Sequence, residues 1–192
     1  PRLNPPPDLS RCVGQPVSVN FTGTAGATYT WSNDNPAIGL GPGGTGSLNF
    51  TGRAPNGQPE TGTITVTPTF GNCVGDPQTF TITINPIPTV DPMPNLTVCA
   101  NDAILASFTG NSSGATYTWT NSNAATGVPL SGSGDMNEIA ATVTTTTTGN
   151  ITVTPSEFGC PGVPRTFMVT VLPLPRVNQL PNLTRCAGQV IN

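Results

Sequence analysis

Apolar and polar residues alternate in a series of short segments along the chain. In the first half, the apolar rows are Val17, Val19 and Phe21; Tyr29 and Trp31; Leu48 and Phe50; Ile64 and Val66; and Phe80, Ile82 and Ile84. A period of two places such side chains on one face of a β-strand. Clusters of Gly, Asn, Asp and Pro separate the rows, and no segment has the 3.6-residue apolar period of a helix. The pattern predicts an all-β protein.

The second half shows the same kind of pattern. Its predicted apolar rows are Ile104, Ala106 and Phe108; Tyr117 and Trp119; Ile139, Ala141 and Val143; Ile151 and Val153; and Phe167, Val169 and Val171. The intervening positions are rich in threonine, which has high β-propensity and suits an outward strand face. A threonine row on a flat sheet also suits ice or sugar binding, but an ordinary solvent face is the favoured interpretation. Each half has one Trp in mid-strand, which favours a core aromatic over a sugar-stacking platform.

The chain repeats itself at an interval of 87 residues. The segment Leu9–Cys12 recurs as Leu96–Cys99 and as Leu183–Cys186, and Cys73 recurs as Cys160. Six or seven short strands within roughly 90 residues are typical of an immunoglobulin-like β-sandwich. The predicted units are a first repeat over residues 1–87, a second over residues 88–174 and the truncated start of a third over residues 175–192.

Proline-rich segments separate the repeats. Residues 85–94 and 172–181 each carry alternating prolines, which fix φ and push the preceding residue towards extended geometry. Prolines also simply terminate strands, but their recurrence at each boundary favours semi-rigid spacers between domains. With strands rising about 3.3 Å per residue, two repeats should form a rod of roughly 80 Å rather than a compact globule.

The repeat suggests how the five cysteines pair. Cys12 and Cys73 are 61 residues apart, as are Cys99 and Cys160. We therefore expect disulfides 12–73 and 99–160, with the partner of Cys186 beyond the end of this chain and one free thiol per chain. In ordinary sandwich topology Cys73 and the start of the strand at Val17 lie at opposite poles, so Cys12 must sit on the first strand or early enough to reach the other pole. An inter-repeat bond such as Cys12–Cys160 is the less favoured alternative. Either scheme indicates an oxidising, extracytoplasmic compartment.

Composition excludes several functional classes. The formal net charge is −3 with only six basic residues and no His, so the basic stripe typical of nucleic-acid binding is absent. No apolar run approaches the 18 or so residues of a membrane helix. The sequence lacks both His and Lys, the commonest general bases and amine nucleophiles, and the cysteines are too scattered for a metal site. We expect no enzyme activity, no catalytic residue, no cofactor and no metal.

Two acidic positions invite a calcium interpretation. Asp135-Met-Asn-Glu138 lacks the glycine and the ligand count of an EF-hand loop, so a solvated turn is favoured. Asp91 lies at the boundary between the repeats, but its counterparts Asn4 and Asn178 are neutral. Neither position predicts a site.

The repeat also carries a recognisable set of motifs. Leu-Thr-Val-Cys99, Ala-Thr-Tyr-Thr-Trp119 and Ile-Thr-Val-Thr-Pro155, with Thr-Phe80 near the end of the unit, resemble the PKD-like repeats of giant Bacteroidetes cell-surface proteins, of which the SprB-type gliding adhesins are examples. The turn after the Trp, Ser32-Asn-Asp-Asn35, differs from the Asp- and Gly-rich turn of PKD domains proper. The resemblance implies type IX secretion, display on the outer membrane and a role in adhesion or gliding motility.

These observations favour a structural role. We expect the repeats to form a stalk or filament of a secreted bacterial surface adhesin, with neighbouring repeats of the same chain as the main partners. Surface polysaccharide and the secretion or motility machinery are further expected partners. The alternative is a carbohydrate-binding or accessory array of a secreted hydrolase.

Overall fold

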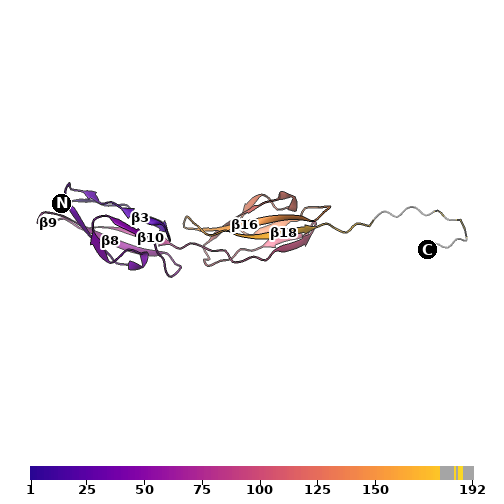
Figure 1. The fold of residues 1–192 in the computed structure, drawn as a ribbon, viewed down its shortest axis with the longest axis horizontal. Helices are drawn as coiled ribbons and strands as arrows, with labels where there is room; N and C mark the ends of the chain where they lie inside the picture. Colours follow the sequence, from indigo (N-terminus) through magenta and orange to yellow (C-terminus); the bar gives the residue numbers. More distant parts are fainter. Residues whose placement is uncertain (178–183, 185, 188–192) are drawn as a thin grey trace.

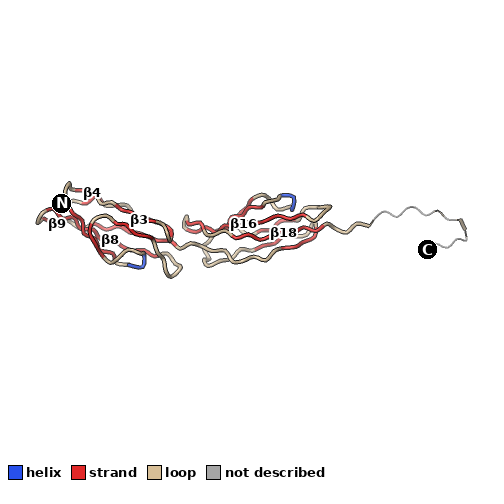
Figure 2. The backbone as a smooth tube through the Cα atoms, viewed as in Figure 1, coloured by secondary structure: helices blue, strands red, loops and turns tan. Residues whose placement is uncertain are grey.

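The computed structural model describes residues 1–177, 184, 186 and 187. Two β-sandwiches follow one another along the chain, one within residues 3–85 and one within residues 96–172. Figure 1 shows them end to end, with the N-terminus at the outer end of the first sandwich and the C-terminal segment leaving the outer end of the second. A single extended connection joins them, drawn as loop in Figure 2.

The first sandwich has one large and one small sheet. The large sheet has the order β2-β10-β8-β5-β6, with β9 added to β8, and the small sheet pairs β3 with β7. A short pair, β1 with β4, closes one end. The elements are β1 (Leu3–Asn4), β2 (Leu9–Cys12), β3 (Pro16–Val19), β4 (Thr22–Gly23), β5 (Thr28–Asn33), the 3-10 turn η1 (Pro36–Ile38), β6 (Gly43–Thr45), β7 (Leu48–Thr51), β8 (Glu60–Phe70), β9 (Cys73–Val74) and β10 (Gln78–Asn85).

The second sandwich repeats this order. Its large sheet runs β11-β18-β16-β13-β14 with β17 added to β16, and its small sheet pairs β12 with β15. The elements are β11 (Leu96–Cys99), β12 (Ala103–Ala106), β13 (Thr116–Asn121), the 3-10 turn η2 (Ala124–Thr126), β14 (Ser131–Ser133), β15 (Met136–Ile139), β16 (Thr147–Glu157), β17 (Cys160–Pro161) and β18 (Arg165–Leu172).

The cores follow the predicted alternation. Ile64, Val66, Ile82 and Ile84 are fully buried in the first sandwich, and the equivalent residues of β16 and β18 are buried in the second. Threonines occupy the outer face, where Thr61 and Thr83 bond to each other through their hydroxyl oxygens at 2.9 Å. The prediction of an all-β, immunoglobulin-like sandwich is confirmed.

One predicted row is wrong in part. The sequence placed Ile139, Ala141 and Val143 on a buried face, whereas β15 ends at Ile139, whose side chain is exposed. Val143 lies beyond the strand and is partly buried against the second core. Met136 is the buried residue that opens this strand, and it occupies the place of Leu48 in the first sandwich. Threonines alternate with apolar residues after this strand, so the sequence pattern resembles that of a further strand. Thr is common both in strands and on outward faces, so the pattern alone does not separate the two.

The tryptophans belong to the cores. Trp119 is buried and Trp31 is half-buried against its cluster. Each indole lies over a glycine of the neighbouring strand: a Cβ on Gly44 would stand 2.5 Å from Cζ2 of Trp31, and a Cβ on Gly132 would overlap the ring of Trp119. With one face closed by backbone, neither ring offers a free stacking platform for a sugar.

A buried asparagine anchors the turn after each Trp strand. In the first sandwich Nδ2 of Asn33 donates to the carbonyls of Leu40 at 2.9 Å and Asn35 at 3.1 Å, and its Oδ1 accepts from the Asn35 amide. Asn121 makes the corresponding bonds to Val128 and Asn123, both at 2.8 Å. The polar side chain is tolerated in the interior because its hydrogen-bonding capacity is used by the loop backbone.

Candidate functional site: the joint between the two sandwiches

The C-terminal ends of β2 and β10 lie at the end of the first sandwich that faces the second. The strand β2 runs parallel to β10, so that Leu9 pairs with Ile82 and Cys12 pairs with Asn85. Asn85 is also the last residue of β10, from which the chain leaves the sandwich. Cys12 therefore lies beside the exit of the chain rather than beside its entrance.

The second sandwich contributes a hairpin to the same joint. The strands β16 and β17 pair through Glu157 and Cys160, with Phe158 and Gly159 at the tip. The chain enters this sandwich next to the hairpin, because the backbone oxygen of Pro88 lies against Gly162. Chain entrance and hairpin cysteine thus share one pole.

A disulfide joins the two sandwiches. Cys12 bonds to Cys160, with their Cα atoms 5.7 Å apart and a sequence separation of 148. The predicted pairs 12–73 and 99–160 are therefore wrong, and the alternative inter-repeat bond is the one observed. Cys73 pairs with Phe70 in the hairpin at the opposite pole from Cys12. The length of β10, roughly 25 Å, separates them, whereas a disulfide requires Cα atoms less than about 7 Å apart.

The remaining cysteines are free. Cys73, Cys99 and Cys186 are exposed thiols in the described part of the chain. This differs from the single free thiol predicted from intra-repeat pairing. Most of the predicted third repeat, residues 178–183, 185 and 188–192, lies outside the described residues.

The joint disulfide is shielded from solvent. Cys160 is 0% exposed and Cys12 only 7% exposed. Reduction proceeds by attack of an external thiolate on a disulfide sulfur, so burial slows it. The Cys12 amide donates to Oε1 of Gln15 at 3.1 Å and the Val13 amide to the carbonyl of Asn85 at 2.9 Å. These bonds hold the cysteine backbone in place at the end of the strand.

Phe158 reaches from the second sandwich towards the first. It borders a surface depression of about 500 Å³ whose other walls come from the first sandwich: Asp8, Leu9, Ser10, Pro59, Thr81, Thr83 and Asn85. Its φ of 50° lies in the left-handed region, where a bulky side chain is a genuine outlier. Such backbone strain persists where surrounding structure holds it, and here the disulfide begins two residues later.

The rim of this depression carries one charged group with a fixed role. Oδ1 of Asp8 accepts a hydrogen bond from the Thr81 amide. Hydrogen bonds from the backbone and then the side chain of Thr81 lower the pKa of this carboxyl below its ordinary value. The charge supports the β2 edge of the sheet and faces no second acidic group that would suggest acid–base chemistry.

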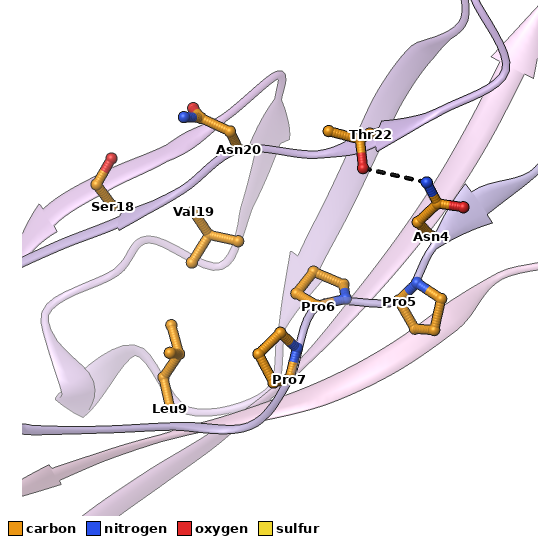
Figure 3. Close-up of a pocket in the computed structure, with 9 residues that line it drawn as sticks. All are labelled: Asn4, Pro5, Pro6, Pro7, Leu9, Ser18, Val19, Asn20 and Thr22. Carbon is orange, nitrogen blue, oxygen red and sulfur yellow. Dashed lines mark hydrogen bonds between the residues drawn. The ribbon is translucent and has the colours of Figure 1, made fainter.

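A second depression lies on the first sandwich alone. It encloses about 350 Å³ between the proline run Pro5–Pro7 and the segment that connects β3 to β4. Figure 3 shows its walls, with Nδ2 of Asn4 donating to Oγ1 of Thr22 at 3.3 Å. No ionisable side chain lines it. The lining therefore offers no general acid or base, and the hydroxyls of Ser18 and Thr22 have no ionisable group beside them in this depression.

The acidic positions considered for calcium have structural partners. Oδ1 of Asp135 accepts from the Phe108 amide at 2.9 Å, and Oδ2 of Asp91 accepts from the Thr109 hydroxyl at 2.7 Å. Among the described residues, no three His, Cys, Asp or Glu side chains gather as a metal site. Nor does the described part contain a helix long and apolar enough to cross a membrane.

Comparisons with known proteins address the fold. No protein-family model matches the chain, and no curated protein matches it. It is similar to the crystal structure of murine CEACAM1b, with 14% identity, a TM-score of 0.44 and coverage of 85% of this chain and 96% of that chain. The N-terminal Ig1-2 module of the Drosophila receptor protein tyrosine phosphatase DLAR matches with 12% identity, a TM-score of 0.33 and coverage of 88% and 96%.

Sidekick-1 immunoglobulin domains 1-5 match with 16% identity, a TM-score of 0.34 and coverage of 90% of this chain and 39% of that chain. The sheet order and the two buried cores of this chain make it an all-β protein with two immunoglobulin-like sandwiches.

Proposed function

We propose that this chain is a structural stalk segment of a secreted cell-surface protein, in which sandwich repeats stand end to end. The observation that carries the proposal is the Cys12–Cys160 disulfide across the joint. Together with the proline-containing connection, it gives the joint two covalent links. Two links at separate points restrict bending and twisting of one sandwich on the other, which a spacer requires and a catalytic domain does not.

The internal organisation of each sandwich supports the same role. Each sandwich has its own buried cluster, one running from Leu3 to Ile84 and the other from Val90 to Val171. Arrays of units that fold on their own cores gain length by adding copies without redesign. A disulfide is stable in oxidising compartments, which supports an extracellular location.

The finer identity rests on the sequence motifs. The similarity to PKD-like repeats of Bacteroidetes surface proteins supports a bacterial, SprB-type adhesin exported by type IX secretion and displayed on the outer membrane, with adhesion or gliding contacts made elsewhere in the protein. Immunogold labelling of thin sections of the source organism tests this location. Labelling confined to the cytoplasm would overturn it and leave the end-to-end fold unaffected.

Small-angle scattering of the oxidised full chain tests the stalk itself. Each sandwich contains a strand of 11 residues, so two sandwiches and their connection should give a maximum dimension of at least ~80 Å at about 3.3 Å per residue. The double variant Cys12→Ser/Cys160→Ser should stay elongated but sample a wider range of inter-sandwich angles. Cys73→Ser removes an exposed free thiol and is the matched control. A near-spherical particle with the sandwiches folded on each other would overturn the proposal.

A further inference from the structure

The outer pole of the second sandwich reproduces the pole that holds Cys12. Cys99 pairs with Leu172 across the parallel strands β11 and β18, as Cys12 pairs with Asn85. The next amide, that of Ala100, donates to the Leu172 carbonyl at 2.8 Å, matching the Val13 bond to Asn85. Cys99 is thus the same structural position as Cys12, one repeat later.

The outer pole of the first sandwich reproduces the pole that holds Cys160. Cys73 follows a two-residue hairpin tip and pairs with Phe70, as Cys160 pairs with Glu157. The chain entrance lies beside this hairpin as well, because the backbone oxygen of Pro1 lies against Gly75 just as that of Pro88 lies against Gly162. Each outer end of the pair of sandwiches therefore carries a cysteine equivalent to one partner of the joint disulfide: Cys73 at one end and Cys99 at the other.

Exposure separates the two free halves from the bonded ones. The bonded cysteines are buried, whereas Cys73 and Cys99 are exposed. Apolar side chains beside them are also exposed: Phe70 at 52% and Val74 at 70% near Cys73, and Leu172 at 38% and Leu174 at 48% near Cys99. Burial of Cys12 and Cys160 at the joint shows what covers such a cysteine, namely the facing pole of another sandwich.

We propose that every repeat uses its two cysteines on different neighbours, giving one disulfide per joint. Cys99 bonds to the hairpin cysteine of a sandwich that follows in tandem, and Cys73 bonds to the β2-end cysteine of a sandwich that precedes. The partner at either pole is another copy of this repeat. The inference rests on the end-to-end arrangement proposed above and adds the disulfide connectivity between neighbouring repeats.

The bond forms by thiol–disulfide exchange with a disulfide oxidant, such as oxidised glutathione or an oxidised dithiol oxidoreductase. The Cys99 thiolate attacks one sulfur of the oxidant, releasing one thiol and leaving a mixed disulfide. The neighbouring cysteine thiolate then displaces the second thiol. Two protein thiols are oxidised to one disulfide while one oxidant disulfide is reduced to two thiols, and the two protons go to the released thiolates.

A chain with a third sandwich tests the wiring. A second copy of residues 88–174 is inserted after Leu174 of the full chain, which keeps the 87-residue interval. The copy carries Val163→Ile, a mass label on an exposed residue of the chymotryptic peptide that contains its Cys160 equivalent. The protein is oxidised with oxidised glutathione and digested with chymotrypsin without reducing agent. We expect the Cys99 peptide to be linked to the labelled peptide and the Cys12 peptide to be linked to the unlabelled one.

The controls separate wiring from shape. Cys99→Ser should leave the labelled cysteine as a free thiol without disturbing the Cys12 bond, and the unextended chain should show three free thiols of its five cysteines. A Cys99 peptide linked to the unlabelled peptide, or a labelled cysteine that stays free in the parent insertion, would overturn the inference. Scattering of the same protein reports extension independently, so an elongated particle lacking the bond rejects the wiring and keeps the stalk.

Discussion

The two sandwiches are built on one plan but fill equivalent hydrogen-bonding positions with different atoms. At the β2 edge, Asp8 accepts from the Thr81 amide in the first sandwich, and Asn95 accepts from the Met168 amide at 2.8 Å in the second. After the Trp strand, the Thr63 amide donates to Asp34 at 2.7 Å. The difference teaches that the fold requires an acceptor oxygen at these points and does not require a charge.

The second acceptor pair follows the same rule. Oγ of Ser122 accepts from the Asn150 amide at 2.9 Å, in the place of the carboxylate of Asp34. The sandwiches also differ in how firmly their tryptophans are enclosed and in the hairpin tips, where Gly71 stands in the place of Phe158. Each difference gives a way to test how far the two repeats are interchangeable.

The largest expected effect is at the glycines under the indoles. Gly132→Ala places a methyl group into the ring of the buried Trp119, so we expect the second sandwich to lose about 3 kcal/mol of unfolding free energy, the upper range for overpacking. Gly44→Ala should cost the first sandwich less, about 1–2 kcal/mol, because Trp31 is only half-buried and has room to shift. Denaturant unfolding followed by hydrogen exchange of each sandwich measures both. Equal losses would show that the burial of the indole does not determine how well an added methyl group is tolerated at these two glycines.

The buried asparagines rank next. Asn33→Ala leaves the carbonyl of Leu40 without its side-chain donor, and we expect the first sandwich to lose about 2 kcal/mol. Asn121→Ala should cost the second sandwich less, because the hydroxyl of Thr126 still donates to the Asn123 carbonyl at 2.9 Å. Thr126→Val in the Asn121→Ala background should abolish this advantage. The comparison fails if the two alanine variants are equally destabilised and the valine adds nothing.

A smaller effect concerns acid. A backbone hydrogen bond from Thr63 and a further one from its side chain lower the pKa of Asp34 below its ordinary value of 3.8. Because the folded pKa is the lower one, the carboxylate stabilises the folded state above pH 3.8, and this contribution is lost as pH falls below 3.8 through the lowered value. The hydrogen bond that the Ser122 hydroxyl oxygen accepts from the Asn150 amide does not titrate. Hydrogen exchange of β8 and β16 peptides between pH 5 and pH 2.5 should therefore show the first sandwich weakening more.

The double variant Asp8→Asn/Asp34→Ser gives the first sandwich the side chains of the second. We expect this variant to remove the extra acid sensitivity of the β8 peptides while leaving those of β16 unchanged. If the first sandwich of the variant still weakened more in acid, the sensitivity would have to come from its other carboxylates.

The smallest effect is expected at the hairpin tip. Phe158→Gly relieves a left-handed φ that costs a non-glycine residue about 1–2 kcal/mol, but removes a ring that borders the first sandwich. The two contributions oppose each other, so the unfolding free energy of the oxidised chain should change by less than about 1 kcal/mol. A loss well beyond that, measured by denaturant unfolding, would show that the ring dominates the joint.

The sequence predicted the parts of the fold that depend on local pattern. Rows such as Phe80, Ile82 and Ile84 alternate because one face of β10 is buried, and that signal lies entirely within the strand. It failed at Ile139, which is exposed at the end of a short strand although the alternation of apolar and polar residues continues beyond it. The 87-residue interval likewise identified equivalent positions, but equivalence does not say which residues meet.

The cysteine pairing depended on topology that spacing does not contain. Cys12 pairs with Cys160 only because β2 runs parallel to β10 and ends beside the chain exit. Had β2 run antiparallel, Cys12 would lie near the hairpin of its own sandwich. The left-handed conformation of Phe158 was also not predictable from the sequence, because turn positions of this kind favour Gly, Asn or Asp over a bulky residue. The nearest usable signal was the expectation that Cys73 and the first strand lie at opposite poles.

The disulfide also decides which part of the chain carries tension when its ends are pulled apart. Force entering at residue 1 reaches Cys12, crosses the sulfur bridge to Cys160 and continues to the C-terminus. The loop between the two cysteines, whose sequence separation is 148, therefore lies outside the stretched path. At about 3.4 Å per extended residue, that loop holds roughly 500 Å of slack that no pull can draw out while the bridge is intact. The oxidised chain is thus nearly inextensible whatever the stability of its sandwiches, and reduction turns it into a long, compliant tether.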